Sequence, residues 1–126
     1  MKKERVSCKR VFDPAPRLFS NAIRYGNLVF TTAKSGTTRA GRLPRGIEAQ
    51  TKQSLENLQA LLEAAGTDLE HVLKTTIYVT STRNLVKVNR VYVRYFRIPP
   101  ARAIVIVKGW GDRNRLIEID AVAGLP

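Results

Sequence analysis

The clearest structural signal in this chain lies in residues 47–80, which read IEAQTKQSLENLQALLEAAGTDLEHVLKTTIYVT. In the first half, leucines recur three and four residues apart, so they share one face of a helix. Gly66 directly follows the last turn of that pattern and can supply a left-handed C-terminal cap. The second half is rich in β-branched residues, which favour a strand. These residues therefore predict a helix over 47–65 and a strand over 72–80.

The remaining elements are predicted on both sides of this helix and strand. Gly26-Asn27 is a two-residue connection suited to a hairpin, and Pro99-Pro100 must stop the second helix. The run Ile104-Val105-Ile106-Val107 is apolar on both faces, which predicts a strand buried on both sides. The further elements are a strand over 5–11, hairpin strands over 22–25 and 28–32, a helix capped by Ser81, Thr82 or Asn84 and ending near Phe96, and strands over 102–108 and 116–122. The predicted order is β-ββ-α-β-α-ββ, an α+β arrangement.

Length and composition limit the domain organisation and the compartment. A chain of 126 residues with 44% apolar content suffices for one core, so we expect a single domain over residues 1–126. No uncharged apolar run approaches the roughly 20 residues that cross a bilayer, and the basic N-terminus lacks an apolar signal core. Cys8 is the single cysteine, so no internal disulfide can form. We therefore expect a soluble, cytoplasmic protein that does not associate with membranes.

The charge of the chain is strongly positive. Twenty-two Lys and Arg residues against 10 Asp and Glu give a formal net charge of +12. Such a surface attracts polyanions, and nonspecific nucleic-acid binding through phosphate contacts is one interpretation. A solvated basic surface, or one that acts on another protein, is the other. The sequence contains neither an RNA-binding aromatic motif nor a zinc-knuckle spacing, so charge alone supports the first interpretation.

Two charged residues near the C-terminus offer chemistry. Arg102 and Glu118 lie in the last two predicted strands, which are neighbours along the chain. An arginine is a planar fork that grips a carboxylate at two points, and a glutamate can accept a proton from water. The pair predicts a site for a small acid that reacts with water. A structural ion pair between the two residues is the competing interpretation.

Several segments together resemble the RidA/YjgF/UK114 family. Two of the most specific are the Gln53-Ser54-Leu55-Glu56-Asn57 helix and the Lys74-Thr75-Thr76 strand, at these spacings from Pro100-Ala101-Arg102 and Ile117-Glu118-Ile119. The other similar segments are residues 19–22, 26–30, 64–66 and 88–89. The resemblance implies a chorismate-mutase-like α+β subunit, with two helices packed on one face of a mixed sheet. It also implies a homotrimer with ligand clefts between adjacent subunits.

The resemblance further implies an activity, the hydrolysis of reactive 2-imino and 2-enamino acids to 2-keto acids and ammonia. No cofactor and no metal is needed in that family. Arg102 would bind the substrate carboxylate, and Glu118 would orient or deprotonate the attacking water. The residues implied to line the pocket are Phe19, Thr32, Ala33, Asn89 and Ile104. Burial of Glu118 near a bound anion should raise its pKa, which helps proton transfer.

Two alternatives to this activity follow from the residues. Family members usually show Ser-Gly-Gln where this chain has Thr32-Ala33-Lys34, so an added methyl and a second cation lie where the pocket is expected. Apolar residues Val86, Val93 and Ile98 fall outside the predicted core among several arginines, a pattern typical of a protein–protein interface. The first alternative is thus a trimeric scaffold with a weak pocket. The second is an RNA-binding or RNA-cleaving protein, suggested by the charge.

Overall fold

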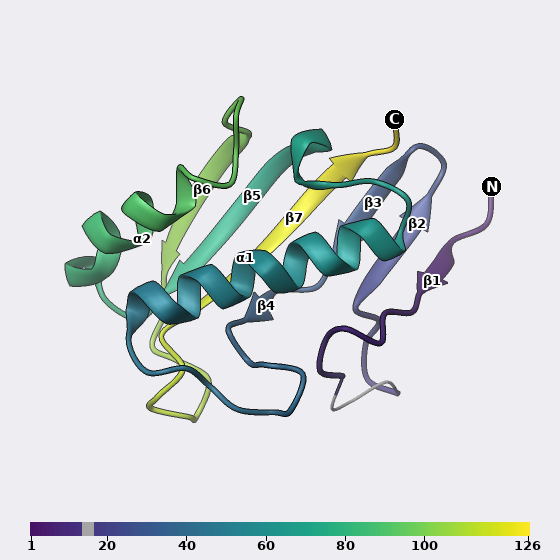
Figure 1. The fold of residues 1–126 in the computed structure, drawn as a ribbon. Helices are drawn as coiled ribbons and strands as arrows, with labels where there is room; N and C mark the ends of the chain where they lie inside the picture. Colours follow the sequence, from purple (N-terminus) through teal and green to yellow (C-terminus); the bar gives the residue numbers. More distant parts are fainter. Residues whose placement is uncertain (14–16) are drawn as a thin grey trace.

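The computed structural model, which describes residues 1–13 and 17–126, contains a mixed sheet with helices on one of its faces (Figure 1). The strands lie in the order β1-β2-β3-β7-β5-β6, and the short β4 also pairs with β7. The β5–β6 pair is parallel and the other pairs are antiparallel. The strands are β1 (Glu4–Val6), β2 (Ala22–Tyr25), β3 (Leu28–Thr31), β4 (Lys34–Ser35), β5 (Val72–Val79), β6 (Ala101–Ile106) and β7 (Ile117–Gly124). The predicted α+β fold class and mixed sheet are confirmed.

Helix α1 (Ile47–Ala64) crosses the sheet and covers its core face (Figure 1). Its leucines are fully buried in the same cluster as Ile77 of β5 and Ile119 of β7. The helix ends as predicted at Gly66, whose φ of 93° is left-handed. The Gly66 amide donates to the Glu63 carbonyl at 3.1 Å and the Thr67 amide donates to the Leu62 carbonyl at 3.0 Å. These two bonds form a Schellman cap, which stops the helix locally.

Buried polar residues on α1 hold the irregular chain around β4. Ser54 Oγ donates to the Lys34 carbonyl at 2.7 Å. Asn57 Nδ2 donates to the carbonyls of Ser35 and Thr37 at 3.0 and 2.9 Å. A strand of two residues cannot satisfy the buried backbone around it through sheet pairing alone, so these side chains complete the hydrogen bonding. They fix β4 and the loop that follows it against the helix.

The second helix is shorter than the sequence predicts. A 3₁₀ turn (Thr82–Asn84) precedes α2 (Leu85–Tyr92), and Ser81 caps that turn by accepting from the Arg83 amide. Beyond the helix, the Arg94 and Tyr95 amides make i→i+3 bonds in place of α-helical ones. The Tyr92 and Phe96 rings pack at a centroid distance of 4.7 Å within the core. The regular helix thus ends well before Pro99.

Two further expectations need correction, and one strand was not predicted. The strand expected over 5–11 is limited to β1. Strand β4 was not predicted, because its two residues are too few to show a hydrophobic period. The run in β6 is not buried on both sides in the single chain, because β6 is an edge strand. Val105 and Ile106 are 41% and 48% exposed. Burial of a strand depends on what packs beside it, which a local pattern does not contain.

The sheet face opposite the helices is uncovered in the single chain. Side chains alternate between the two faces of a strand, so every second residue of β2, β3, β6 and β7 points away from α1. The exposed large side chains that point away from α1 on these strands are Tyr25, Leu28, Phe30 and Val105. An apolar sheet face of this kind is typical of an interface between subunits. In the described part of the chain, neither helix combines the length and apolarity that a membrane span requires.

Gly36→Ala should destabilise the fold, because Gly36 packs directly on the backbone of α1. A Cβ at this position would lie 2.6 Å from the Gln50 carbonyl oxygen and 2.8 Å from its Cα. Backbone cannot move aside cheaply, so we expect a loss of about 2 kcal/mol or more in the free energy of unfolding. Gly124→Ala is the matched control, since its new Cβ would meet nothing closer than 4.0 Å. Equal denaturant midpoints for the two variants would contradict this packing argument.

Candidate active site

Glu118 is a largely buried carboxylate in the centre of the sheet. It pairs in register with Tyr78 of β5 and with Ser35 of β4. Its side chain is 13% exposed and accepts a hydrogen bond from Arg115 Nη1 at 3.0 Å. Burial raises the pKa of Glu118 above its ordinary value, and the Arg115 ion pair opposes that rise only in part. The carboxylate is therefore better suited to accepting a proton than an exposed glutamate is.

Glu118 borders a hollow of about 250 Å³ that contains four of the predicted site residues. Phe19 comes from the segment before β2, and Thr32 and Ala33 come from the link between β3 and β4. The full lining is Phe12, Phe19, Thr32, Ala33, Lys34, Ser35, Thr37, Arg115 and Glu118. The fold thus brings Phe19, Thr32, Ala33 and Glu118 together, although they are far apart in sequence.

The two substitutions expected to disturb the pocket have mild structural effects. No described residue other than glycine has a positive φ, so Ala33 does not occupy a conformation that requires glycine. Lys34 is buried, and its Nζ donates to Asn21 Oδ1 at 2.8 Å and to the Phe12 carbonyl at 3.3 Å. Burial lowers the pKa of this amine. Lys34 therefore holds the N-terminal segment, and its ammonium group is committed to these partners.

Arg102 forms a second group with Asn89 and Ile104. Its Nη1 donates to Asn89 Oδ1 of α2 at 2.8 Å, and its guanidinium lies 5.0 Å from the centroid of the Tyr92 ring. Ile104 lies two residues further along β6 and is half-buried. Within the described chain, no carboxylate lies within ion-pair distance of Arg102. Asn89 thus orients one side of the exposed Arg102 guanidinium group, and the other side is free to bind a carboxylate.

Within one chain, the Arg102 group and the Glu118 group are separate. Strand β5 lies between β6 and β7, so the two residues are not on neighbouring strands of the sheet. Arg102 is in register with Thr75, which is buried and bonded to Tyr92 on the helix side. Glu118 is in register with Tyr78, three residues later in β5, and so points to the opposite face. The ion pair considered from the sequence does not form within the chain, and Glu118 pairs with Arg115 instead.

Arg115 was not predicted as a neighbour of Glu118. Arg115 follows a turn in which the Asn114 amide donates to Asp112 Oδ1 at 2.9 Å. That turn folds the loop back, so an arginine three residues before the strand glutamate reaches its carboxylate. The available signal was the Asp-Arg-Asn-Arg run of turn-forming and basic residues directly before β7. In the described part of the chain, no cluster of three or more His, Cys, Asp or Glu side chains could hold a metal ion.

Comparison with known proteins agrees with this architecture. Residues 12–125 match the family model described as Endoribonuclease L-PSP. A RutC family protein of Pyrococcus horikoshii is 40% identical over 108 residues, which cover 83% of this chain and 85% of the relative. The chloroplastic Reactive Intermediate Deaminase A of Arabidopsis thaliana is 36% identical over 99% of this chain and 67% of its own length. The crystal structure of the YjgF gene product of E. coli superposes with a TM-score of 0.88 at 27% identity, over 96% of this chain and 98% of that one.

The class of protein follows from two findings. The fold is a YjgF-like sheet with two helices, and the sequence similarity extends along most of the chain. This chain belongs to the Endoribonuclease L-PSP family, which is the RidA/YjgF family that its sequence resembles. It is thus a homologue of a reactive intermediate deaminase at 36% identity.

Glu118→Gln should change how stability depends on pH. Because its pKa is raised in the folded protein, the folded state holds this proton more tightly than the unfolded chain does. The stability of the parent protein should therefore fall, relative to the variant, as pH rises above the ordinary glutamate value of 4.5. Urea unfolding of both proteins between about pH 4 and about pH 8 measures this difference. Stability curves that stay parallel over the whole range would show that Glu118 titrates as it does in the unfolded chain.

Proposed function

We propose that this chain hydrolyses 2-imino and 2-enamino acids to 2-keto acids and ammonia. The observation that carries the proposal is Glu118, a buried carboxylate with a raised pKa that opens on a hollow lined by Thr32 and Ala33. The similarity to a protein named Reactive Intermediate Deaminase A supports this substrate class. Phe19 supplies an aromatic wall to the same hollow.

The reaction needs a positioned substrate and one proton acceptor. An imine carbon is already electrophilic, so water adds to it once Glu118 takes a proton from the attacking oxygen. Glu118 passes that proton to the imine nitrogen, so the carbon then bears a hydroxyl and an amino group. Glu118 next takes the proton of that hydroxyl and passes it to the amino nitrogen. The carbon–nitrogen bond breaks as the carbon–oxygen double bond forms, which releases ammonia and leaves the 2-keto acid. Arg102 binds the substrate carboxylate, and Asn89 orients the guanidinium for that task.

The complete site, in this proposal, lies between two subunits of a homotrimer. Arg102 and Glu118 point to opposite faces of one sheet, so Arg102 of one subunit would meet Glu118 of its neighbour. The uncovered sheet face with Tyr25, Phe30 and Val105 offers the surface on which subunits would pack. The trimer itself is inferred from the family resemblance. Ile104 would line the cleft beside Arg102.

Removal of either charged residue should abolish the activity. An amino-acid oxidase generates 2-iminobutanoate or 2-iminopropanoate in situ, and semicarbazide traps the imine that remains. We expect the parent protein to speed loss of the imine, and Arg102→Ala and Glu118→Ala each to lower kcat/KM by about 100-fold or more. Arg83→Ala removes an equal charge from an exposed site on the 3₁₀ turn and should leave the rate unchanged.

A mixing experiment then tests whether the site is shared. Arg102→Ala and Glu118→Ala chains are coexpressed, so that some interfaces combine the intact Arg102 of one chain with the intact Glu118 of the other. If the chains assort at random, about one quarter of the interfaces contain both an intact Arg102 and an intact Glu118. About one quarter of the parent activity should therefore return. If the mixture stays as inactive as its components, both residues act within one chain. Activity in the separate single variants would instead remove the assigned roles.

The scaffold alternative has an observation of its own. Val86, Val93 and Ile98 are 69%, 66% and 71% exposed, which confirms that they lie outside the core. Exposed arginines 83, 90, 94 and 97 lie around them on the same segment. If this patch joins trimers into a larger assembly, light scattering should give a mass above that of a trimer. Replacing the three apolar residues by serine should then reduce the mass to a trimer, whereas a trimeric parent protein would exclude this role for the patch.

A further inference from the structure

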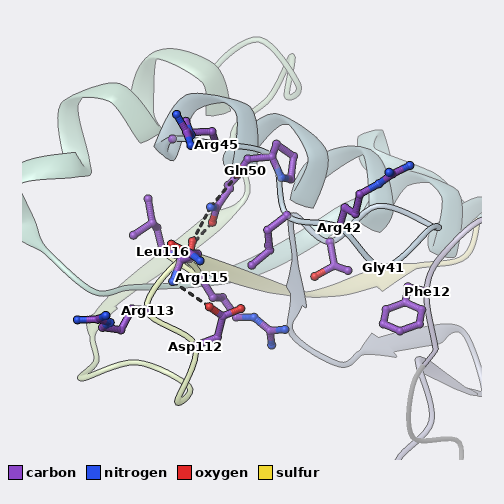
Figure 2. Close-up of a pocket in the computed structure, with 14 residues that line it drawn as sticks. Phe12, Gly41, Arg42, Arg45, Gln50, Asp112, Arg113, Arg115 and Leu116 are labelled. Atoms are coloured by element: carbon purple, nitrogen blue, oxygen red, sulfur yellow. Dashed lines mark hydrogen bonds between the residues drawn. The ribbon is translucent and has the colours of Figure 1, made fainter.

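A second and larger hollow, of about 580 Å³, lies between two loops below the start of α1 (Figure 2). One wall comes from residues 41–46 before the helix, and the other comes from residues 112–116 before β7. It shares Phe12, Thr37 and Arg115 with the Glu118 hollow but contains none of the predicted catalytic or substrate-binding residues. Its volume falls within the range of small-molecule sites, about 300 to 1,000 Å³.

Positive charge is concentrated around this hollow. Arg42 and Arg45 come from the first loop and Arg113 and Arg115 from the second, against a single lining carboxylate, Asp112. Figure 2 shows Arg42, Arg45 and Arg113 at the rim, with head groups directed outward. No described residue forms an ion pair or a side-chain hydrogen bond with these three guanidinium groups. They are therefore free to turn toward a bound anion.

Arg115 is the inner member of this group. Its Nη1 is paired with Glu118, but its Nε is buried and lacks a hydrogen-bond partner among the described residues. A buried donor without a partner costs free energy, which a bound acceptor would recover. Among the described residues, the lining of the hollow thus includes Arg115 with one unsatisfied donor, and three arginines without a partner for their guanidinium groups.

The walls are held in place by a buried side chain. Gln50, which is 1% exposed, donates through Nε2 to the Pro44 carbonyl at 3.0 Å and to the Asn114 carbonyl at 2.6 Å. Its Oε1 accepts from the Leu116 amide at 3.0 Å. One residue of α1 therefore joins both loops, as the dashed lines in Figure 2 show. The hollow is fixed before any ligand binds, which lowers the ordering cost of binding.

The start of α1 adds to the positive potential. Gly46 precedes the helix with φ 91° and provides no side-chain cap. The cap residue therefore offers the first amides of the helix no side-chain acceptor, and the positive end of the helix dipole faces this region. Leu43, Pro44 and Leu116 supply apolar surface in the same hollow. A ligand that uses all these features has clustered negative charge and an apolar or aromatic part.

We propose that this hollow binds a small molecule that carries a diphosphate group. The paired N–H donors of a guanidinium group match the geometry of phosphate oxygens. Three unpaired guanidinium groups around one cavity offer more donors than a ligand with a single carboxylate would need. The exposed Phe12 ring and the apolar wall would accept an organic group joined to the diphosphate. The proposal concerns a site distinct from the Glu118 hollow, and it stands whether or not the chain is a deaminase.

Arg115 would connect the two hollows. A diphosphate near its guanidinium places negative charge close to Glu118, whose other charged or titratable neighbours are Lys34 of β4 and Tyr78 of β5. Added negative charge favours the protonated carboxyl, so a bound ligand should raise the pKa of Glu118 further. The ligand would in this way change the state of the proposed catalytic carboxylate from outside its pocket.

The test is calorimetric titration with inorganic pyrophosphate and with ADP at about 0.15 M salt, where long-range charge attraction is largely screened. We compare the triple variant Arg42→Gln, Arg45→Gln, Arg113→Gln with the control Arg83→Gln, Arg90→Gln, Arg94→Gln. Each variant removes three positive charges, and only the first alters the hollow. We expect the pocket variant to weaken binding of both probes about tenfold or more, and the control variant to change it less than about twofold.

Amide chemical shifts of the parent protein provide a second measurement that does not depend on whether the variants fold. In the parent protein, ADP should shift the amide signals of Gly46 and Ile47 and leave those of Val86 and Val93 in place. Absence of binding at this salt concentration would overturn the proposal, as would equal losses in the two triple variants. Binding of an RNA oligonucleotide with the same variant pattern, but no binding of pyrophosphate or ADP, would also overturn it. No imine is used, so failure of the deaminase activity does not affect the result.

Discussion

The buried polar face of α1 is the constraint on which the rest of this structure depends. Gln50, Ser54 and Asn57 lie about one helical turn apart and bond backbone groups of β4, of the loop that follows it and of the loop before β7. Those segments are too irregular to satisfy their backbone hydrogen-bonding groups through sheet pairing. Burying several such groups without partners would cost free energy comparable to the net stability of a folded domain. Both hollows have walls made from the segments that this face holds.

The position of α1 also explains why the candidate site residues and the uncovered apolar residues are distributed over two faces of the sheet. Helices α1 and α2 both pack on one face, and the apolar residues of the other face remain uncovered in the single chain. Glu118 opens on the uncovered side beside β4, whereas Arg102 turns toward α2 and Asn89. A site that needs both residues therefore needs a second copy of the chain. This division is the physical basis of the proposed shared site.

Much of the fold could be predicted from local sequence, and much of the site could not. The leucine spacing, the Gly66 cap and the β-branched run gave α1 and β5 to within about a residue of their observed ends. The predicted end of α2 was wrong because the chain changes to i→i+3 bonds at Arg94 and Tyr95, well before Pro99. The family resemblance named residues that do meet, such as Thr32 and Glu118, but could not place Arg115 beside them.

The sequence by itself determined which elements form, because helix periodicity, caps and turns depend on residues a few positions apart. It also determined the charge of +12 and the presence of a guanidinium and a carboxylate at Arg102 and Glu118. Only the tertiary structure decided that β5 separates these two residues, that Lys34 is buried against Asn21, and that four arginines surround one cavity. Strand order and loop packing bring together residues distant in the chain, and no local pattern encodes those distances.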